Sequence, residues 1–372
     1  MKKLGFGLMR LPLLDNDDKS SIDIEQVMPM VDLFMERGFT YFDTAYDYHD
    51  GHSETTFREA VVKRYPREAF TVTDKFPIWE VKSADDLPRI FNEQLERCGV
   101  EYFDYYWLHA INKSYYEKIQ QYDVFSFISR MKQEGKVRHM GFSFHDDPEL
   151  LEIVLTEHPE TEFVQLQINY IDWDSPRVHA SKCHEICTQH GKPVIVMEPV
   201  KGGALAKVPE KVDELFRSIN PDMSAASWAV RYTASLPNIY MVLSGMSNLE
   251  QVDDNTSFMQ DFVPLNEQEK EAIDTAATII KESKGIPCTA CHYCTNGCPM
   301  DIAIPEYFAL YNTVKQFGDG QRWMEPINKY QQLCETHSKA SECLKCGQCE
   351  SRCPQQLPII ENLELVAQEF EK

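Results

Sequence analysis

Up to Phe262, short runs rich in β-branched and aromatic residues alternate with longer stretches in which apolar residues recur every three or four positions. The short runs predict strands, and the longer stretches predict amphipathic helices that bury one face. The predicted strands cover residues 3–9, 41–43, 70–75, 104–108, 139–142, 163–167, 194–197 and 239–244. The predicted helices between them include 24–37, 84–98, 125–134, 148–158, 178–190 and 225–233.

Eight strand–helix pairs of this kind predict an α/β fold, a (β/α)8 TIM barrel. A doubly wound parallel sheet is the alternative, but no glycine-rich GxGxxG turn opens a helix after an early strand. After Phe262 the rhythm stops, and a last helical stretch, 266–284, ends at Gly285 and Pro287. The predicted domains are therefore a barrel (1–262), a connecting helix (263–285) and a small second domain (286–372).

Composition narrows the class of protein. The chain has 372 residues, of which 43% are hydrophobic, and a formal net charge of −22. This charge argues against nucleic-acid binding, which depends on basic surfaces. An acidic run follows Arg10 before a signal-length apolar core can form, and no window resembles a membrane span. We therefore expect a soluble cytoplasmic protein without a membrane partner. Its acidic surface suits either a redox-protein partner or plain solubility.

Eight of the twelve cysteines occur in two copies of one spacing, Cys-x2-Cys-x2-Cys-x3-Cys-Pro. The spacing is typical of proteins with two 4Fe-4S clusters. A zinc ribbon would show two CxxC pairs with a gap between them, and disulfide frameworks suit short secreted chains. A helical run at 305–317 separates the copies, which predicts a mainly helical ferredoxin-like domain. The predicted ligands are Cys288, Cys291, Cys294 and Cys298 in the first copy, and Cys343, Cys346, Cys349 and Cys353 in the second.

Polar residues end three consecutive predicted strands. Asp43 ends the second strand, Lys75 the third, and His109 follows the fourth. Tyr48 lies on the loop after Asp43. In a (β/α)8 barrel the carboxyl ends of the strands surround the active site. A lysine beside a tyrosine is expected to lower the pKa of the phenol, and an aspartate can orient that lysine. The tyrosine can then donate a proton to a carbonyl oxygen held by the histidine, which predicts carbonyl or alcohol redox chemistry.

The segments around these residues resemble the aldo/keto reductase superfamily. They read YFDTAYDYHDGHSE around Asp43 and Tyr48, TVTDKFP around Lys75, and YYWLHA around His109. The four residues match the catalytic tetrad of that family one for one. With its cysteine-rich tail, the chain resembles the aldo/keto reductases that carry a C-terminal 4Fe-4S ferredoxin domain. The resemblance implies a small carbonyl or alcohol substrate and a nicotinamide cofactor, NAD(P)(H), across the barrel mouth.

The resemblance also implies residues that would contact this cofactor. Ser143, Gln165 and Asn169 occupy the region that holds the nicotinamide carboxamide. Met197 stands where well-known members stack a tyrosine on the ring. Backbone amides after the eighth strand can bind a phosphate without cations, so FMN would also satisfy that site and would convert between two-electron and one-electron transfer. The residues implied at the phosphate element are Ser244, Gly245, Met246, Ser247, Gln251 and Asn255.

Several hypotheses stay open. The first is an iron–sulfur oxidoreductase with Tyr48 as proton donor, and the second is an electron-transfer or adaptor protein whose non-catalytic barrel docks a redox partner. In a third, the clusters only stabilise the tail. The ligand sharing of such domains implies one cluster on Cys288, Cys291, Cys294 and Cys353, and the other on Cys343, Cys346, Cys349 and Cys298.

Two further groups of residues have both a functional and a structural interpretation. Cys183 and Cys187 lie four positions apart on a predicted helix that carries three histidines, a pattern that fits a metal site but is more typical of buried apolar thiols. Aromatic residues after predicted strands fit a substrate pocket or packing at the barrel mouth. These are Trp79, Tyr115, Tyr116, Tyr170 and Trp173.

Overall fold

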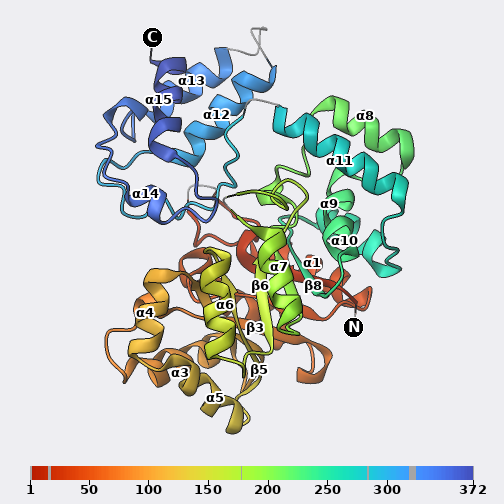
Figure 1. Ribbon diagram of the computed structural model, residues 1–372, viewed down its shortest axis with the longest axis vertical. Helices are drawn as coiled ribbons and strands as arrows, with labels where there is room; N and C mark the ends of the chain where they lie inside the picture. The colour runs from red at the N-terminus through yellow and green to blue at the C-terminus, as the bar shows by residue number, and fades with distance from the viewer. Residues whose placement is uncertain (1, 16–17, 177, 283–284, 318–323, 372) are drawn as a thin grey trace. The chain divides into compact units, whose positions relative to one another are not determined.

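The computed structural model describes residues 2–15, 18–176, 178–282, 285–317 and 324–371. Within these residues, eight parallel strands close into one barrel in chain order, with the last strand paired to the first (Figure 1). This confirms the predicted (β/α)8 barrel. The strands are β1 (Leu4–Gly7), β2 (Tyr41–Asp43), β3 (Thr71–Phe76), β4 (Phe103–Ile111), β5 (Val137–Phe144), β6 (Phe163–Gln167), β7 (Val194–Met197) and β8 (Ile239–Gly245).

Helices alternate with these strands, and the six predicted barrel helices differ from the observed ones by at most two residues at either end. Helices α2, α4, α8 and α10 were not among those named from the sequence. The helices up to the end of the barrel are α1 (Ile24–Glu36), α2 (Ser53–Phe57), α3 (Asp86–Cys98), α4 (Lys113–Gln121), α5 (Val124–Gln133), α6 (Pro148–Glu157), α7 (Ala180–Gln189), α8 (Glu210–Ile219), α9 (Ala225–Ser235) and α10 (Leu249–Gln260).

Short polar side chains start several helices just after a strand. The Asp147 carboxylate accepts a hydrogen bond from Leu150 N at 2.9 Å, and Pro148 occupies the first position of α6. Asn248 likewise accepts from Gln251 N at 2.9 Å at the start of α10. These caps satisfy N–H groups that have no partner within the helix, so they define where each helix begins.

Large side chains from alternate strand positions fill the barrel interior. Gly141 leaves room for one of them, because a Cβ atom placed there would lie 2.5 Å from the Trp107 ring and 2.3 Å from Phe163 O. Strand side chains alternate between two faces, so the positions two residues further along these strands also face inward. The buried cluster comprises Tyr41, Tyr105, Trp107, Phe163, Ile195, Met241 and Leu243, and the same face continues at positions 43, 109, 143, 165 and 197.

The chain forms two compact units. The first contains the barrel strands and comprises Met1–Ser175, His179–Pro199 and Ala226–Glu267. The second comprises Pro176–Val178, Val200–Ala225 and Gln268–Lys372. The segment that follows β7 in the chain is therefore grouped with the cysteine-rich tail.

The second unit is mainly helical, as predicted. Its core includes a stack of aromatic rings: Tyr330 lies 4.6 Å from Tyr307 and 4.9 Å from Phe370, measured between ring centroids. Helices α12, α13 and α15 bring these rings together (Figure 1). Among the described residues, none of the helices is long and apolar enough to cross a membrane. Besides α8, the helices here are α11 (Glu267–Glu282), α12 (Ile304–Phe317), α13 (Met324–Leu333), α14 (Gln348–Ser351) and α15 (Ile359–Phe370).

Candidate active site and cysteine centres

The structure brings the four predicted tetrad residues together at the carboxyl end of the barrel. Asp43 is the last residue of β2, Lys75 lies one residue before the end of β3, and His109 is near the end of β4. Tyr48 starts a short turn in which His49 has a positive φ of 54°. His49 holds that turn, because its Nε2 accepts from Leu11 N at 3.1 Å and its Nδ1 can then donate to Lys19 O at 3.0 Å.

The Lys75 ammonium is the centre of the site. Its Nζ atom donates to Asp43 Oδ1 at 2.5 Å, to Thr44 O at 2.7 Å and to Tyr48 OH at 3.2 Å. The side chain is 1% exposed, and an ammonium offers three N–H donors, so each can point to one of these partners. This geometry fixes the phenol oxygen beside a cation.

The pKa of Tyr48 lies well above its usual range, because the phenol is buried and faces the carboxylates of Asp43 and Asp47. The prediction of a lowered pKa was therefore wrong in its net direction, because burial and the nearby carboxylates outweigh the charge of Lys75. A phenol in this environment stays protonated at neutral pH, which is the state that a proton donor requires.

His109 is neutral in this environment. Burial, followed by the charges of Lys75 and His145, holds the pKa of His109 well below its usual range. Its ring centroid lies 6.1 Å from that of Tyr48, and its Nδ1 atom lies 3.8 Å from Asp47 Oδ1. A neutral imidazole has one N–H group that can donate to a carbonyl oxygen placed near the Tyr48 hydroxyl.

A buried acidic pair lies behind Lys75, and the sequence analysis did not include it. Asp74 Oδ1 accepts from Lys75 N at 2.8 Å, and Gln94 Nε2 donates to Glu54 Oε1 at 3.1 Å and to Lys75 O at 3.0 Å. Burial raises the pKa of both carboxyl groups, and the charge of Glu54 raises that of Asp74 further. Within the described residues, Glu54, Asp74 and Cys98 also form the group whose ligand atoms lie within 4.8 Å of one another. The position of Asp74 next to Lys75 in the sequence could have indicated this acidic group.

Two of the five aromatic residues named from the sequence lie beside the tetrad. The Trp79 ring is 5.1 Å from that of His109 and 5.9 Å from that of Tyr115, measured between centroids. Tyr116 instead donates to Glu157 Oε2 at 2.5 Å, which is a packing role. Asp47 lies at the same mouth, and burial raises the pKa of its carboxyl to about 6. The mouth therefore combines an aromatic wall with a carboxyl group that titrates close to neutrality.

The residues implied at the nicotinamide carboxamide lie on neighbouring strands. Ser143 and Gln165 are register partners on β5 and β6, and Ser143 Oγ accepts from Ala110 N at 2.8 Å. Met197 pairs in register with Gln167 on β7 and β6. The Asn169 amide nitrogen donates to Asp172 Oδ2 at 2.8 Å, so Asn169 is already engaged within its own loop.

The predicted phosphate element is held by its own side chains. Asn255 Nδ2 donates to Ser244 Oγ at 2.9 Å, and Gln251 Oε1 accepts from Ser247 N at 2.8 Å. Gln251 therefore occupies one of the backbone amides that could face a phosphate. Met246 is 0% exposed, so its side chain packs inside the protein rather than facing a ligand.

Arg10 is a cation next to this element that the sequence analysis did not include. A Cβ atom placed on Gly245 would lie 3.3 Å from the Arg10 Cβ and Cγ atoms. Gly7 at the end of β1 pairs in register with Gly245 on β8, which brings the two loops together. The predicted barrel could have indicated this position of Arg10, since closure places the loop after the first strand beside the loop after the eighth.

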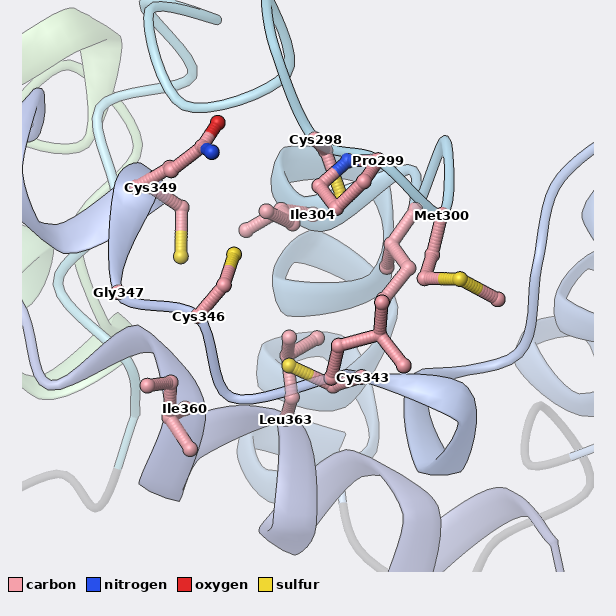
Figure 2. Close-up of a pocket in the computed structure, with 13 residues that line it drawn as sticks. Cys298, Pro299, Met300, Ile304, Cys343, Cys346, Gly347, Cys349, Ile360 and Leu363 are labelled. Carbon is pink, nitrogen blue, oxygen red and sulfur yellow. The ribbon is translucent and has the colours of Figure 1, made fainter.

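Each of two hollows in the second unit is lined by four predicted ligand cysteines. We call them the first hollow, of about 310 Å³, and the second hollow, of about 340 Å³. Figure 2 shows the second hollow, with Cys298 from the first copy of the spacing facing the cysteines of the second copy. Cysteines 288, 291, 294 and 353 line the first hollow, and cysteines 298, 343, 346 and 349 line the second.

The surroundings of both hollows are mainly apolar. Ile304 lines both, with Ile359 at the first and Ile360 at the second. Burial raises the pKa of Cys288 to about 12 and that of Cys349 to about 11. Thiols of this kind ionise only when a metal centre compensates the charge, which suits a buried iron–sulfur cluster.

The remaining cysteines have structural surroundings. Cys183 and Cys187 are 3% and 0% exposed. His184 on the same helix contacts Pro237 O through Nε2 at 2.7 Å, and His190 contacts Glu152 at 2.9 Å. These contacts support the interpretation of the α7 thiols as packing groups.

The comparisons with known proteins agree with this architecture. Residues 3–278 match the aldo/keto reductase family, and residues 287–357 match the 4Fe-4S dicluster domain. The chain therefore belongs to the aldo/keto reductase family and is an oxidoreductase whose barrel is followed by a 4Fe-4S dicluster domain.

Two curated relatives are similar to the barrel. An uncharacterized oxidoreductase of Schizosaccharomyces pombe is 25% identical over 272 residues, which cover 68% of this chain and 80% of that protein. The NAD/NADP-dependent indole-3-acetaldehyde reductase of the same yeast is 26% identical over 156 residues, or 41% of this chain and 51% of that protein.

Solved structures share the fold. A Klebsiella pneumoniae aldo/keto reductase in complex with NADP and acetate superposes with a TM-score of 0.59 at 20% identity, covering 73% of this chain and 90% of that one. The holo form of an aldo-keto reductase from Bacillus halodurans gives a TM-score of 0.58 at 23% identity, with 74% and 91% covered.

Proposed function

We propose that this chain interconverts a small carbonyl compound and its alcohol with a nicotinamide cofactor, and exchanges electrons through two 4Fe-4S clusters. The observation that carries the first part is the buried contact of Lys75 Nζ with Asp43 Oδ1 and Tyr48 OH. The eight cysteines around two apolar hollows carry the second part.

In the direction of reduction, Tyr48 donates its hydroxyl proton to the carbonyl oxygen. Lys75 stabilises the phenolate that remains, since its ammonium lies 3.2 Å from the phenol oxygen. Asp43 keeps Lys75 in place, and His109 donates a hydrogen bond to the same carbonyl oxygen. When bound, the nicotinamide supplies a hydride to the carbonyl carbon, and each cluster carries one electron.

Several residues fit the nicotinamide cofactor. Ser143 and Gln165 would hold the carboxamide, and the loop from Ser244 to Ser247 would hold a phosphate, with Arg10 as a neighbouring cation. The Klebsiella reductase binds NADP, whereas FMN has no support from the proteins compared above. We therefore favour NAD(P)(H) over FMN.

Substitution of Tyr48 tests the catalytic part. With NADPH or NADH and a panel of aromatic aldehydes and dicarbonyls, Tyr48→Phe should lower kcat about 10²-fold or more, because the proton donor is removed. Tyr46→Phe is the matched control: Tyr46 lies on the same loop as Tyr48, but its hydroxyl donates to Glu93 on α3 at 3.5 Å, so turnover should be unchanged. Equal turnover by both variants would favour a non-catalytic barrel that docks a redox partner.

An anaerobic titration with NADH and then NADPH tests the electron path. Bleaching of the broad cluster absorbance would support transfer between the nicotinamide and the clusters. If only dithionite bleaches it, nicotinamide is not the electron donor of the clusters, and a redox-protein partner becomes the candidate.

A further inference from the structure

A short turn that follows β7 in the chain packs against the first cysteine copy. Lys201–Gly203 forms this 3-10 turn, and it belongs to the same compact unit as the cysteine-rich tail. Gly202 has a φ of 63°, and a Cβ atom placed on it would lie 2.4 Å from Thr289 O. Thr289 lies between Cys288 and Cys291. The absence of a side chain at Gly202 therefore lets the turn lie directly on the backbone of the first copy.

The same turn places a buried cation beside the first hollow. Lys201 Nζ donates to Gln355 Oε1 at 2.9 Å, and both residues are only 5% exposed. Gln355 lies two residues after Cys353 and lines the first hollow together with it. One side chain therefore separates the Lys201 ammonium from the space that the four thiols surround.

A histidine also lines the first hollow. It is His292, and its Nδ1 atom lies 3.6 Å from Glu306 Oε1. The second hollow has a different cation nearby: Lys345, between Cys343 and Cys346, is bonded to Glu364 at 2.6 Å, and its side chain is 62% exposed. Solvent screens such a charge far more than it screens a buried one.

We propose that Lys201 sets the reduction potential of the cluster bound by Cys288, Cys291, Cys294 and Cys353. This rests on the ligand sets proposed above. Reduction adds one electron to a cluster and neither makes nor breaks a bond, so a nearby fixed positive charge stabilises the reduced form. Lys201 thus makes the cluster in the first hollow easier to reduce than it would be without this charge.

The test is a redox titration of the anaerobic holoprotein with dithionite and mediators, followed by electron paramagnetic resonance. Lys201→Met should make one of the two clusters harder to reduce, with about a tenfold fall in its equilibrium constant, which equals 59 mV for one electron. Lys201→Arg keeps the charge and should stay close to the unmodified protein. Lys345→Met is the exposed control and should shift neither potential by that amount.

Lys201→Gln removes the charge but keeps a polar group with N–H donors at this position. The proposal expects the same fall in this variant, and an unchanged potential would overturn it. If Lys201→Met loses iron, Lys201→Gln decides the question. Both potentials unchanged in a protein that retains about eight iron atoms would refute only the role of Lys201, whereas about four iron atoms in the unmodified protein would refute the two proposed ligand sets.

Discussion

Replacement of Lys75 by methionine tests whether the central ion pair has separate structural and catalytic roles. Asp43 and Lys75 are 3% and 1% exposed, so Lys75→Met leaves a carboxylate buried without its cation. Removal of one partner from a buried pair costs about 3–5 kcal/mol, because the other charge stays buried. For a barrel of this size, that corresponds to a fall in Tm of roughly 6–20 °C.

The loss should depend on pH in a defined direction. Burial already raises the pKa of Asp43 against the opposing charge of Lys75, and removal of that charge raises it further. When the pKa of a carboxyl group is higher in the folded state than in the unfolded state, its contribution to stability is fully present below the unfolded-state pKa. This contribution is lost as the pH rises through the folded-state pKa, because the group must then ionise while it is buried. The destabilisation of Lys75→Met should therefore be small in acid and largest above neutrality.

A second substitution should restore stability without restoring turnover. Asp43→Asn in the Lys75→Met background removes the unpaired charge, so most of the lost Tm should return, while the carbonyl reductase activity stays absent. Lys63→Met is the matched control, because its pair with Glu59 is 55% and 47% exposed and should contribute at most about 0.5 kcal/mol.

The assay is thermal unfolding of the full anaerobic protein by circular dichroism at one scan rate, at pH values from 5 to 9. Iron–sulfur proteins unfold irreversibly, so apparent Tm values are compared only at equal scan rates. A double variant as unstable as Lys75→Met, or a loss of Tm that is the same at every pH, would refute the electrostatic explanation.

Two further predictions concern the hollows and the barrel mouth. Cys353→Ser should disturb the cluster of the first copy and leave that of the second, as measured by iron content and paramagnetic resonance. Cys334→Ser is the control and should keep both clusters, because its thiol contacts Tyr307 OH at 3.4 Å. Loss of only the second cluster in Cys353→Ser would contradict the shared ligand sets. Because burial raises the pKa of Asp47 to about 6, ionisation of this group costs folding free energy as the pH rises from its unfolded pKa to about 6. Asp47→Asn should therefore raise the free energy of unfolding above pH 6 by about 1–2 kcal/mol, after allowance for its partial exposure, and raise the Tm with it; both should change little below pH 4. An equal gain at both pH values would contradict this assignment.

The sequence predicts the barrel well because its signals are local. Up to β8, segments with the two-residue repeat of strands alternate with segments that have the three-to-four-residue repeat of helices. The order of the elements therefore follows directly from the sequence. Helix α4 was not predicted because it is short and polar, and its start depends on Asn112, whose side chain accepts from Tyr115 N at 2.9 Å. That contact requires a loop conformation that periodicity does not encode.

The candidate site is predictable where chemistry follows from spacing. The cysteine copies and the positions of Asp43 and Lys75 at strand ends are of this kind. The pKa of Tyr48 is not, because its direction depends on burial and on carboxylates from other elements. Arg10 and Lys201 also escape detection, since each acquires its neighbours only when the chain folds.

The exchange of one thiol between the two cysteine copies has a consequence for assembly. Neither copy supplies all four cysteines of one hollow, although 44 residues separate Cys298 from Cys343. With the proposed ligand sets, a chain that takes up the first cluster must already have drawn Cys353, and with it the second copy, into position. Uptake of the first cluster therefore brings the cysteines of the second copy close to Cys298, which should help the second site to form.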